Sequence, residues 1–543
     1  MDIGFSMDRV LDVENTMELV PKTAVNVAKI AAKADSNSTS LISFTNVVPP
    51  SPHSLIARVL RLRYRLQVVS TIAAAANRGI QCAAMFFNQM TTAAKGADAA
   101  AAGAPDVTAS FCAFPIQSVA QTISLTLNGT ETTVQASDLI HALSRTLSEE
   151  ELTRYASECP CYLDDMTSYT REFGSARGPI GNVYYKPRTR SEFAPLTNVL
   201  SGANLIQTQV YEFVEDLWVS PFTLGNRSDL EGLAHVNNIS LQIRLGDIQK
   251  MVSACNTTGT VVVQANFVEI PSLELVYYQL PEAMRKALPP KVYYPYDHIQ
   301  RFQTTYNPGG LLNVAPAVSN YGTSAIQLPS IPHKLVIFVQ YKPSNKTQAT
   351  SDTFAHITGV DITFMGRTGL LANMTSFDLW RMSCENGLNV PYQQWRNGCG
   401  SVLIVRPDRN LGLEVGSYVG VAGEQTTFQA SLSFDFANYL NATDAESPNV
   451  AMDINIVPIT EGKCVLSDDL TCQFVTLDIN KSTVNTLSSE APVEEPPAAS
   501  GSGLHRVRKF LKRRHRGGSS LGGAPLGGAS LGGRVYNKRH PRE

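Results

Sequence analysis

The sequence of 543 residues lacks the patterns that mark membrane-spanning, metal-binding and disulfide-rich proteins. It has no apolar run of the roughly 18 to 20 residues that a membrane-spanning helix requires. The nine cysteines include no CxxC pair, and their odd number argues against a complete disulfide framework, so reduced thiols are expected. The nine histidines are isolated, without HxH or HExxH spacing. The sequence therefore predicts no metal site and no cofactor.

Catalytic motifs are missing as well. Cys159-Pro-Cys161 is the closest cysteine pair, but two thiols in a turn are more often structural than reactive. The adjacent carboxylates of Asp164 and Asp165 point apart in an extended chain, and Gly174-Ser-Ala-Arg-Gly178 places its serine one position early for a nucleophile elbow. No segment combines a nucleophile, a base and an orienting group, so no enzyme activity is predicted.

The N-terminal residues do not predict a secretory signal. The first twenty residues alternate acidic with apolar residues and lack both a basic start and an uninterrupted apolar core. Synthesis in the cytosol is therefore expected.

Alternation of apolar and polar residues with a period of two is the strongest pattern present. In Leu60-Arg-Leu-Arg-Tyr-Arg-Leu-Gln-Val68 the arginines fall on one face and the apolar residues on the other, as in a half-buried strand. The same alternation recurs at 123–127, 239–245, 360–364, 432–436 and 452–456, whereas 261–263 and 335–339 are apolar on both faces, as in central strands. Many short strands separated by Gly, Pro and Asn turns predict an all-β fold of sandwiches or barrels.

Helical patterns are few and short. Ser137-Asp138 is predicted to cap a helix that carries Leu139 to Leu147, and Ser376 to cap a helix over 377–384. Ala24 to Lys33 is a third candidate. Without regular helices between the strands, a parallel α/β enzyme fold is disfavoured.

Changes in composition predict five segments. Residues 1–40 are expected to form an N-terminal arm, and a proline-rich break around Leu288-Pro-Pro separates two β-domains, 41–285 and 286–487. Residues 488–503 are a Pro/Ser/Gly linker that cannot bury enough apolar area to fold, and 504–543 are a basic, Gly-rich tail that is expected to be disordered.

The tail holds 11 Lys and Arg against one acidic residue, although the whole chain has a formal net charge of -2. Flexible cations neutralise phosphates without reading sequence, so the tail is predicted to bind nucleic acid nonspecifically, to act as a nuclear-import signal, or to be merely solvated. The candidate residues are Arg506, Arg508, Lys509, Lys512, Arg513, Arg514 and Arg516. A period-five repeat follows at Ser520, Pro525 and Ser530, each starting x-Leu-Gly-Gly, and its small residues favour a flexible spacer.

Three segments resemble the double jelly-roll major capsid proteins of double-stranded DNA viruses, the lineage of adenovirus hexons and Polintons that includes adintovirus-like and adomavirus-like agents. These segments are Ser43 to Arg58, Tyr211 to Phe222 with Glu231 to Ser240, and Phe377 to Gly387 with Gly400 to Asp408. The resemblance spans roughly residues 40 to 485. The Leu-Gly-Gly repeats are also similar to the sites of adenovirus-type maturation proteases, although the glycines stand one position closer to the leucine.

The resemblance implies two tandem eight-stranded jelly rolls and a structural role as an icosahedral shell subunit, with three chains per pseudo-hexameric capsomer. Expected partners are the chain itself, neighbouring capsomers and penton or minor capsid proteins, with viral DNA and nuclear import receptors as candidates for the tail. The expected location is the virion, reached through the host cytoplasm and then the nucleus. Two alternatives stay open at this point: a viral or cellular β-sandwich that binds a receptor or glycan, and a hydrolase on a β-sandwich scaffold.

Overall fold

The computed structural model describes residues 26–476, except 73–106, 149–196, 223–231, 257–260, 308–317, 347–353, 413–425, 436–450 and a few breaks of three residues or fewer. Met1–Val484 forms one compact unit, and Asn485–Glu543 is a second unit that lies outside the described residues. Within the described residues, every strand pair is antiparallel.

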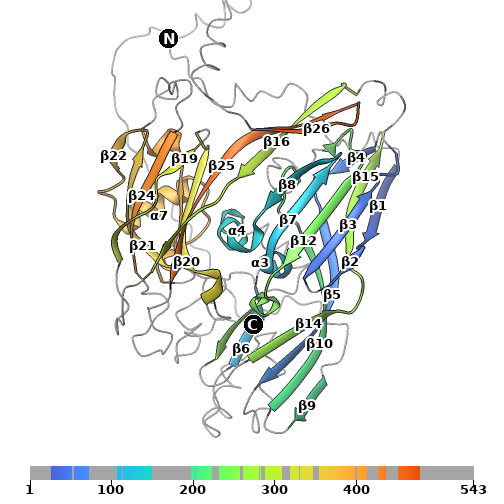
Figure 1. Ribbon diagram of the computed structural model, residues 1–543, viewed down its shortest axis with the longest axis horizontal. Helices are drawn as coiled ribbons and strands as arrows, with labels where there is room; N and C mark the ends of the chain where they lie inside the picture. Colours follow the sequence, from blue (N-terminus) through green and yellow to red (C-terminus); the bar gives the residue numbers. More distant parts are fainter. Residues whose placement is uncertain are drawn as a thin grey trace, which may run out of the picture. The chain divides into compact units, whose positions relative to one another are not determined.

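The strands fall into two groups that do not pair with each other among the described residues (Figure 1). The first group is β1 (Asn26–Lys33), β2 (Ser36–Asn37), β3 (Leu41–Val47), β4 (Ser54–Ala57), β5 (Arg61–Ile72), β6 (Val107–Phe111), β7 (Ala120–Leu127), β8 (Thr130–Val134), β9 (Thr197–Ser201), β10 (Asn204–Asp216), β11 (Gly232–Leu233), β12 (Ile239–Leu245), β13 (Val252–Asn256), β14 (Val261–Phe267) and β15 (Ser272–Gln279). The second is β16 (Lys291–Ile299), β17 (Phe302–Tyr306), β18 (Val318–Gly322), β19 (Ile326–Leu328), β20 (Lys334–Tyr341), β21 (His356–Phe364), β22 (Arg367–Leu370), β23 (Val402–Val405), β24 (Thr426–Asp435), β25 (Met452–Ser467) and β26 (Cys472–Thr476).

Each group builds two large sheets. In the first, an 8-stranded sheet runs β11-β4-β15-β5-β10-β9 with β1 and β14 added beside β15 and β5, and a 5-stranded sheet runs β2-β3-β12-β7-β8; β13 and β6 form a further pair. In the second, a 6-stranded sheet is centred on β25 and β20, and a 5-stranded sheet on β24 and β21. The buried apolar side chains of both groups join in one continuous core. The predicted all-β architecture is confirmed.

Alternation along the strands explains why one face of each sheet is buried. In β12 the burial alternates as the sequence predicts, with the apolar residues inside, and β5 buries Leu62, Tyr64 and Leu66 while Arg63 is exposed. β20 is buried on both faces between β25 and β23, which confirms the prediction of a central strand over 335–339.

β25 departs from its predicted pattern in one respect. The sequence places Asp453 and Asn455 on a polar face, but both side chains are 0% exposed. Thr305 Oγ1 donates to Asp453 Oδ1 at 2.8 Å, and Asn455 Nδ2 donates to the carbonyl of Asp453 at 3.2 Å. Residues 452–460 of β25 are all buried, so both faces of the strand are covered there, and alternation identified the strand but not its exposure.

The helices are short, as expected. Among the described residues they are α3 (Pro115–Val119), α4 (Ala136–Leu143), α7 (Ser376–Glu385), α8 (Tyr392–Asn397) and α9 (Pro407–Asn410), with 3-10 turns η2 (Ser144–Thr146), η3 (Ile248–Met251) and η4 (Pro343–Asn345). No helix among the described residues is long and apolar enough to cross a membrane.

Both predicted helix caps are wrong by one or two residues. α4 begins at Ala136 after Gln135, which makes no side-chain cap, and α7 is capped by Thr375 rather than Ser376. Thr375 and Asp378 form a reciprocal capping box, so the carboxylate three residues inside the helix selects the threonine as its partner. The hydrogen bonds to Thr375 also lower the pKa of the Asp378 carboxyl.

The third predicted helix, Ala24 to Lys33, is wrong. Residues Asn26–Lys33 form β1, which pairs along its whole length with β15. An alanine- and lysine-containing stretch has helix propensity by itself, but the edge of β15 offers a full ladder of backbone partners that local propensity does not outweigh. β1 thus pairs with β15, and β2 with β3, although both strands come from the segment predicted as an N-terminal arm. The domain limits at 40, 285 and 487 stay predictions.

Candidate functional site

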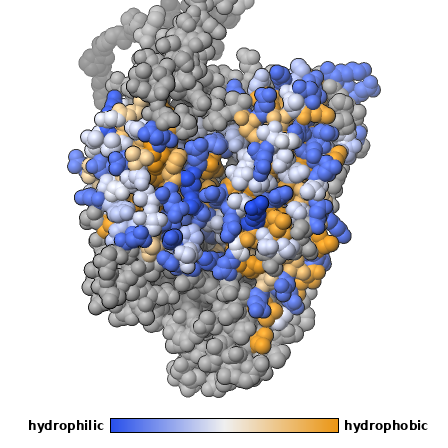
Figure 2. Space-filling view, in the orientation of Figure 1, coloured by the Kyte–Doolittle hydropathy of each residue, from blue (hydrophilic) through white to orange (hydrophobic). Residues whose placement is uncertain are grey.

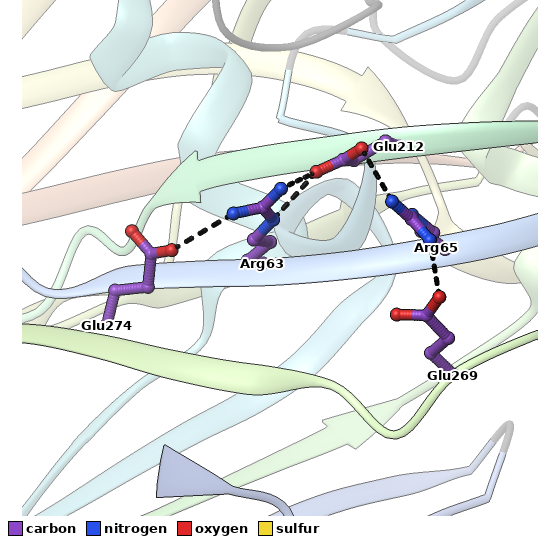
Figure 3. Close-up of polar contacts among 5 residues, drawn as sticks. All are labelled: Arg63, Arg65, Glu212, Glu269 and Glu274. Carbon is purple, nitrogen blue, oxygen red and sulfur yellow. Dashed lines mark hydrogen bonds and ion pairs between the residues drawn. The ribbon is translucent and has the colours of Figure 1, made fainter. Parts of the chain in front are cut away.

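A row of arginines on β5 carries a dense set of ion pairs, and Figure 3 shows those of Arg63 and Arg65. Because strand side chains alternate, the arginines of the Leu60 strand share the face opposite the core. Acids from the neighbouring strands β10 and β15, and from the turn after β14, lie on the same face. We call this set the charged ladder; it consists of Arg61, Arg63, Arg65, Glu212, Asp216, Glu269 and Glu274.

Glu212 is the centre of the charged ladder. Arg63 Nε donates to Glu212 Oε1 at 2.7 Å, and Arg65 Nη2 donates to Glu212 Oε2 at 3.4 Å. Arg63 also reaches Glu274 at 3.6 Å, and Arg65 pairs with Glu269. The carboxylates of Glu212 and Glu274 belong to residues only 3% and 7% exposed, so the arginines shield them from water.

The electrostatics of this set favour a charged Arg63. Burial works to lower the pKa of Arg63, but the hydrogen bond and charge of Glu212, followed by those of Glu274, outweigh it and raise the pKa. Arg61 pairs with Asp216 at 2.9 Å in the same way. Each arginine of this stretch thus forms an ion pair with an acid. The arginine face of β5 therefore does not offer a polyanion a surface of unpaired positive charge.

A second set of polar contacts joins the two strand groups, and we call it the seam. It comprises the side-chain hydrogen bonds and ion pairs that run from residues 54–279 to residues 289–476. Arg58 is 1% exposed and donates to the carbonyls of Pro221 at 2.7 Å and, across the seam, of Pro295 at 3.2 Å. Asp138 pairs with Arg301.

Three further bonds extend the seam. Arg145 Nη1 donates to the carbonyl of Gly400 at 2.8 Å, Thr130 Oγ1 donates to the carbonyl of Cys472 at 2.6 Å, and Lys250 Nζ donates to the carbonyl of Pro343 at 2.6 Å. The Arg145 bond is buried and the other two are half-buried, so water competes with them less than with exposed pairs, and they fix the two groups more firmly against each other.

Two bases lie close to the seam: His141, which is buried, and Lys346, which is half-buried. Burial lowers the pKa of His141 on α4 to about 3, with Lys346 and Arg145 adding repulsion. Burial also lowers the pKa of Lys346 to about 8, against the attraction of Asp138. Both groups are therefore held in environments that disfavour their charged forms.

One serine, one histidine and one acid meet at the N-terminal end of α7. Ser376 Oγ lies 2.8 Å from His356 Nε2, and His356 Nδ1 lies 3.0 Å from Asp435 Oδ1. Because a carboxylate only accepts, Nδ1 donates to Asp435, and in the neutral imidazole, whose Nε2 then carries no proton, the Ser376 hydroxyl donates to Nε2. The imidazole belongs to a residue 4% exposed and packs edge-on against Trp395, with ring centroids 5.6 Å apart, so the trio ties α7 to β21 and β24.

The predicted tail residues, Arg506 to Arg516, lie outside the described residues, as do Cys159, Asp164 and the Leu-Gly-Gly repeats. Within the described ranges, no group of three or more His, Cys, Asp and Glu side chains could hold a metal ion. Sequence reasoning found the arginine face of β5 but missed its acidic partners and the whole seam. For the acids, the sequence offered only the alternation of the strands that carry them, and alternation does not say which side chains an acid contacts.

Known capsid proteins match the chain in sequence. The family model described as the Sputnik virophage major capsid protein 1st domain matches residues 5–275, and that described as the major capsid protein V20 C-terminal domain matches residues 299–399. The putative capsid protein V20 of Sputnik virophage is 25% identical over 393 residues, which cover 66% of this chain and 63% of that protein. The matched part thus spans less than two thirds of that relative's length.

Solved structures show the same fold. A chain of the Sputnik virophage cryo-EM structure matches with a TM-score of 0.64 at 19% identity, covering 94% of this chain and 98% of that chain. The mavirus major capsid protein matches with a TM-score of 0.60 at 13% identity, covering 91% and 97%. The two sandwiches are therefore a double jelly roll. The chain belongs to the double jelly-roll major capsid proteins of double-stranded DNA viruses, as the sequence resemblance predicts.

Proposed function

We propose that the chain is the shell subunit of an icosahedral virion, and that three copies assemble into one capsomer. Each copy supplies two similar sandwiches, so three copies place six similar lobes around one axis. Such a capsomer packs pseudo-hexagonally although it has only three chains. This role is mechanical, and the chain acts through its surfaces rather than through a reaction.

The seam carries this proposal. A pseudo-hexagonal capsomer keeps its outline only when the two sandwiches of each chain hold a fixed angle. The buried contact of Arg145 and the half-buried contacts of Arg58 and Asp138 across the seam, together with the continuous core, supply that rigidity. A pair of independent binding modules on a linker would not need them.

Contacts between capsomers are expected to use exposed residues on several faces. The face shown in Figure 2 mixes hydrophilic and hydrophobic residues over short distances. In the part of the chain that the structure describes, the exposed large apolar residues are Val48, Val268, Ile270, Phe377 and Leu470, which come from both strand groups. Mixed polar and apolar surfaces suit interfaces that form late between folded subunits. Penton and minor capsid proteins are further proposed partners.

The basic tail is proposed to act apart from the shell. Its cations, Arg506 to Arg516, are matched by no acids nearby in sequence, in contrast to the arginines of the charged ladder. They would contact viral DNA or an import receptor, with assembly in the nucleus after synthesis in the cytoplasm. No catalytic step is proposed, because the Ser376–His356–Asp435 trio is packed against Trp395 and serves to hold α7.

Electron microscopy and native mass spectrometry of the recombinant chain test the proposal together. Trimers with a pseudo-hexagonal outline are expected, while single chains at all concentrations would favour the receptor- or glycan-binding alternative. A chain that ends at Gly503 should form the same trimers and lose salt-sensitive DNA binding or nuclear accumulation. If this truncated chain does not fold, the separation of tail and shell is wrong.

A further inference from the structure

Two cysteines of the β25–β26 hairpin lie close together in the core. The Sγ atoms of Cys464 and Cys472 are 3.9 Å apart, and both residues are buried. Register places Cys464 opposite Phe474 and Leu466 opposite Cys472, so the two thiols occupy diagonal positions on one face of the hairpin. Neither is bonded to the other in this structure, where both are free thiols.

We propose that Cys464 and Cys472 form a reversible disulfide when the protein passes from a reducing to an oxidising environment. A disulfide bond measures about 2.05 Å, so the two sulfurs would need to approach by about 1.9 Å from their present separation. That movement is available because β26 pairs only with β25 among the described residues and can shift as an edge strand. A bond across diagonal positions is also easier to reduce again than one between ideally placed cysteines.

The two thiols differ in how they can react. Cys464 sits in the central strand β25, where burial, followed by the neighbouring Cys472, raises its pKa well above the ordinary value. Cys472 lies on the edge strand, between the exposed Thr471 and Gln473. Local opening of an edge hairpin costs less than global unfolding, so Cys472 is the thiol that meets an oxidant first.

The oxidant would be a low-molecular-weight disulfide. The Cys472 thiolate attacks one of its sulfurs, a mixed disulfide forms and one small thiol leaves. The Cys464 thiolate then attacks the Cys472 sulfur and releases the second small thiol. The two cysteines lose two protons and two electrons, and the small disulfide gains them as two thiols.

The bond would strengthen the seam. The carbonyl of Cys472 accepts the hydrogen bond of Thr130 from β8, and the ring of Phe474 packs on Tyr296 at 4.8 Å. Closing the short loop between the two cysteines restricts the unfolded hairpin and holds β26 against β8 and β16. A shell subunit would gain stability outside the cell and lose it on return to a reducing cytosol. Only this timing rests on the proposed function, because the chemistry needs the folded chain alone.

Mass spectrometry of the full-length chain tests the inference directly. The protein is purified under reductant, moved into a glutathione buffer rich in the oxidised form, quenched in acid, alkylated and digested with trypsin. Lys463 and Lys481 are the nearest cleavage sites, so residues 464–481 carry both cysteines in one fragment. We expect this fragment to lack two hydrogens and to take up no alkyl group, and the Tm of the oxidised protein to rise. Full alkylation of both thiols under these conditions, or a glutathione adduct at Cys472 that never resolves, overturns the inference.

Matched variants separate this pair from the other thiols. Cys384→Ser removes a half-buried cysteine on α7 and should keep both the oxidised fragment and the Tm rise. Cys464→Ser should abolish both and leave a stable glutathione adduct on Cys472. If Cys464→Ser does not fold, the wild-type fragment still decides. Native mass spectrometry of the same samples distinguishes the two proposals, because oxidation of a chain that stays monomeric supports the disulfide and contradicts the capsomer.

Discussion

The guanidinium of Arg145, in the 3-10 turn η2 that follows α4 in the first jelly roll, donates to the carbonyl of Gly400 in the second jelly roll at 2.8 Å. The same guanidinium lies 4.4 Å from the centre of the Phe354 ring, and Arg145 is 3% exposed. One side chain thus binds a backbone carbonyl and an aromatic face of the partner sandwich. The hydrogen bond joins residues that are 255 positions apart in the chain.

Arg145→Met is expected to loosen the seam. Methionine keeps most of the apolar volume, but the charge-assisted hydrogen bond to Gly400 is lost, at about 1.5–3 kcal/mol of unfolding free energy. The change is measured as the shift in denaturant midpoint. Arg367→Met is the matched control, since Arg367 makes a similar 2.7 Å bond to the carbonyl of Gly412 but is exposed. Its cost should stay within about 0.5 kcal/mol, and equal shifts for both variants would contradict the role of the seam.

Gly400→Ala is expected to prevent proper folding. Gly400 has a φ of +94°, and a Cβ built there would lie 1.8 Å from the carbonyl oxygen of Phe354. That oxygen is backbone and cannot rotate away, so a cost above about 4 kcal/mol is expected. Gly129→Ala is the control, because Gly129 has a φ of +88° but nothing within 4 Å. It should cost about 1 kcal/mol. Soluble yield and Tm of the two variants measure the difference.

Arg63→Ala is expected to destabilise the first jelly roll through Glu212. The variant leaves this buried carboxylate with only the longer contact to Arg65, which predicts a loss of about 1–3 kcal/mol. Arg381→Ala removes an exposed pair with Glu385 and should change the unfolding free energy by less than about 0.5 kcal/mol. Chemical denaturation of both variants measures these costs. Replacing Arg63 and Glu212 together by leucine should recover part of the loss. If the double variant loses as much unfolding free energy as the two single leucine variants added together, the two residues do not stabilise each other and the charged ladder is contradicted.

His141 is expected to make stability fall as the pH is lowered. Its pKa is about 3 in the folded chain and ordinarily 6.5, so the folded state binds fewer protons between these values. The stability that depends on a neutral His141 is present above pH 6.5. As the pH falls from 6.5 toward 3, the free energy of unfolding decreases by about 1.4 kcal/mol for each pH unit through this group. The wild type should thus lose about 2 kcal/mol between pH 6.5 and pH 5 through this group. Unfolding midpoints across that range should fall less steeply for His141→Gln, and parallel slopes would rule out His141 as the cause.

Local pattern predicted the strands well, because alternation is a property of each segment alone. The arginine face of β5 and the strand at β12 follow directly from residue order. The prediction was wrong at Asn26–Lys33, where pairing with β15 outweighs helix propensity, and it misjudged the exposure of Asp453, since the packing of neighbouring strands decides which polar face is covered.

The sequence by itself determined the all-β character of the body, the shortness of its helices and the basic composition of the tail. The resemblance in three segments was enough to indicate the capsid class. Only the tertiary structure decided that Glu212 is held between Arg63 and Arg65, that Arg145 reaches Gly400, and that Cys464 lies beside Cys472. The physical reason is that period and propensity act over a few neighbouring residues. Charge pairing, seam contacts and thiol proximity depend instead on which distant strands the common core brings together.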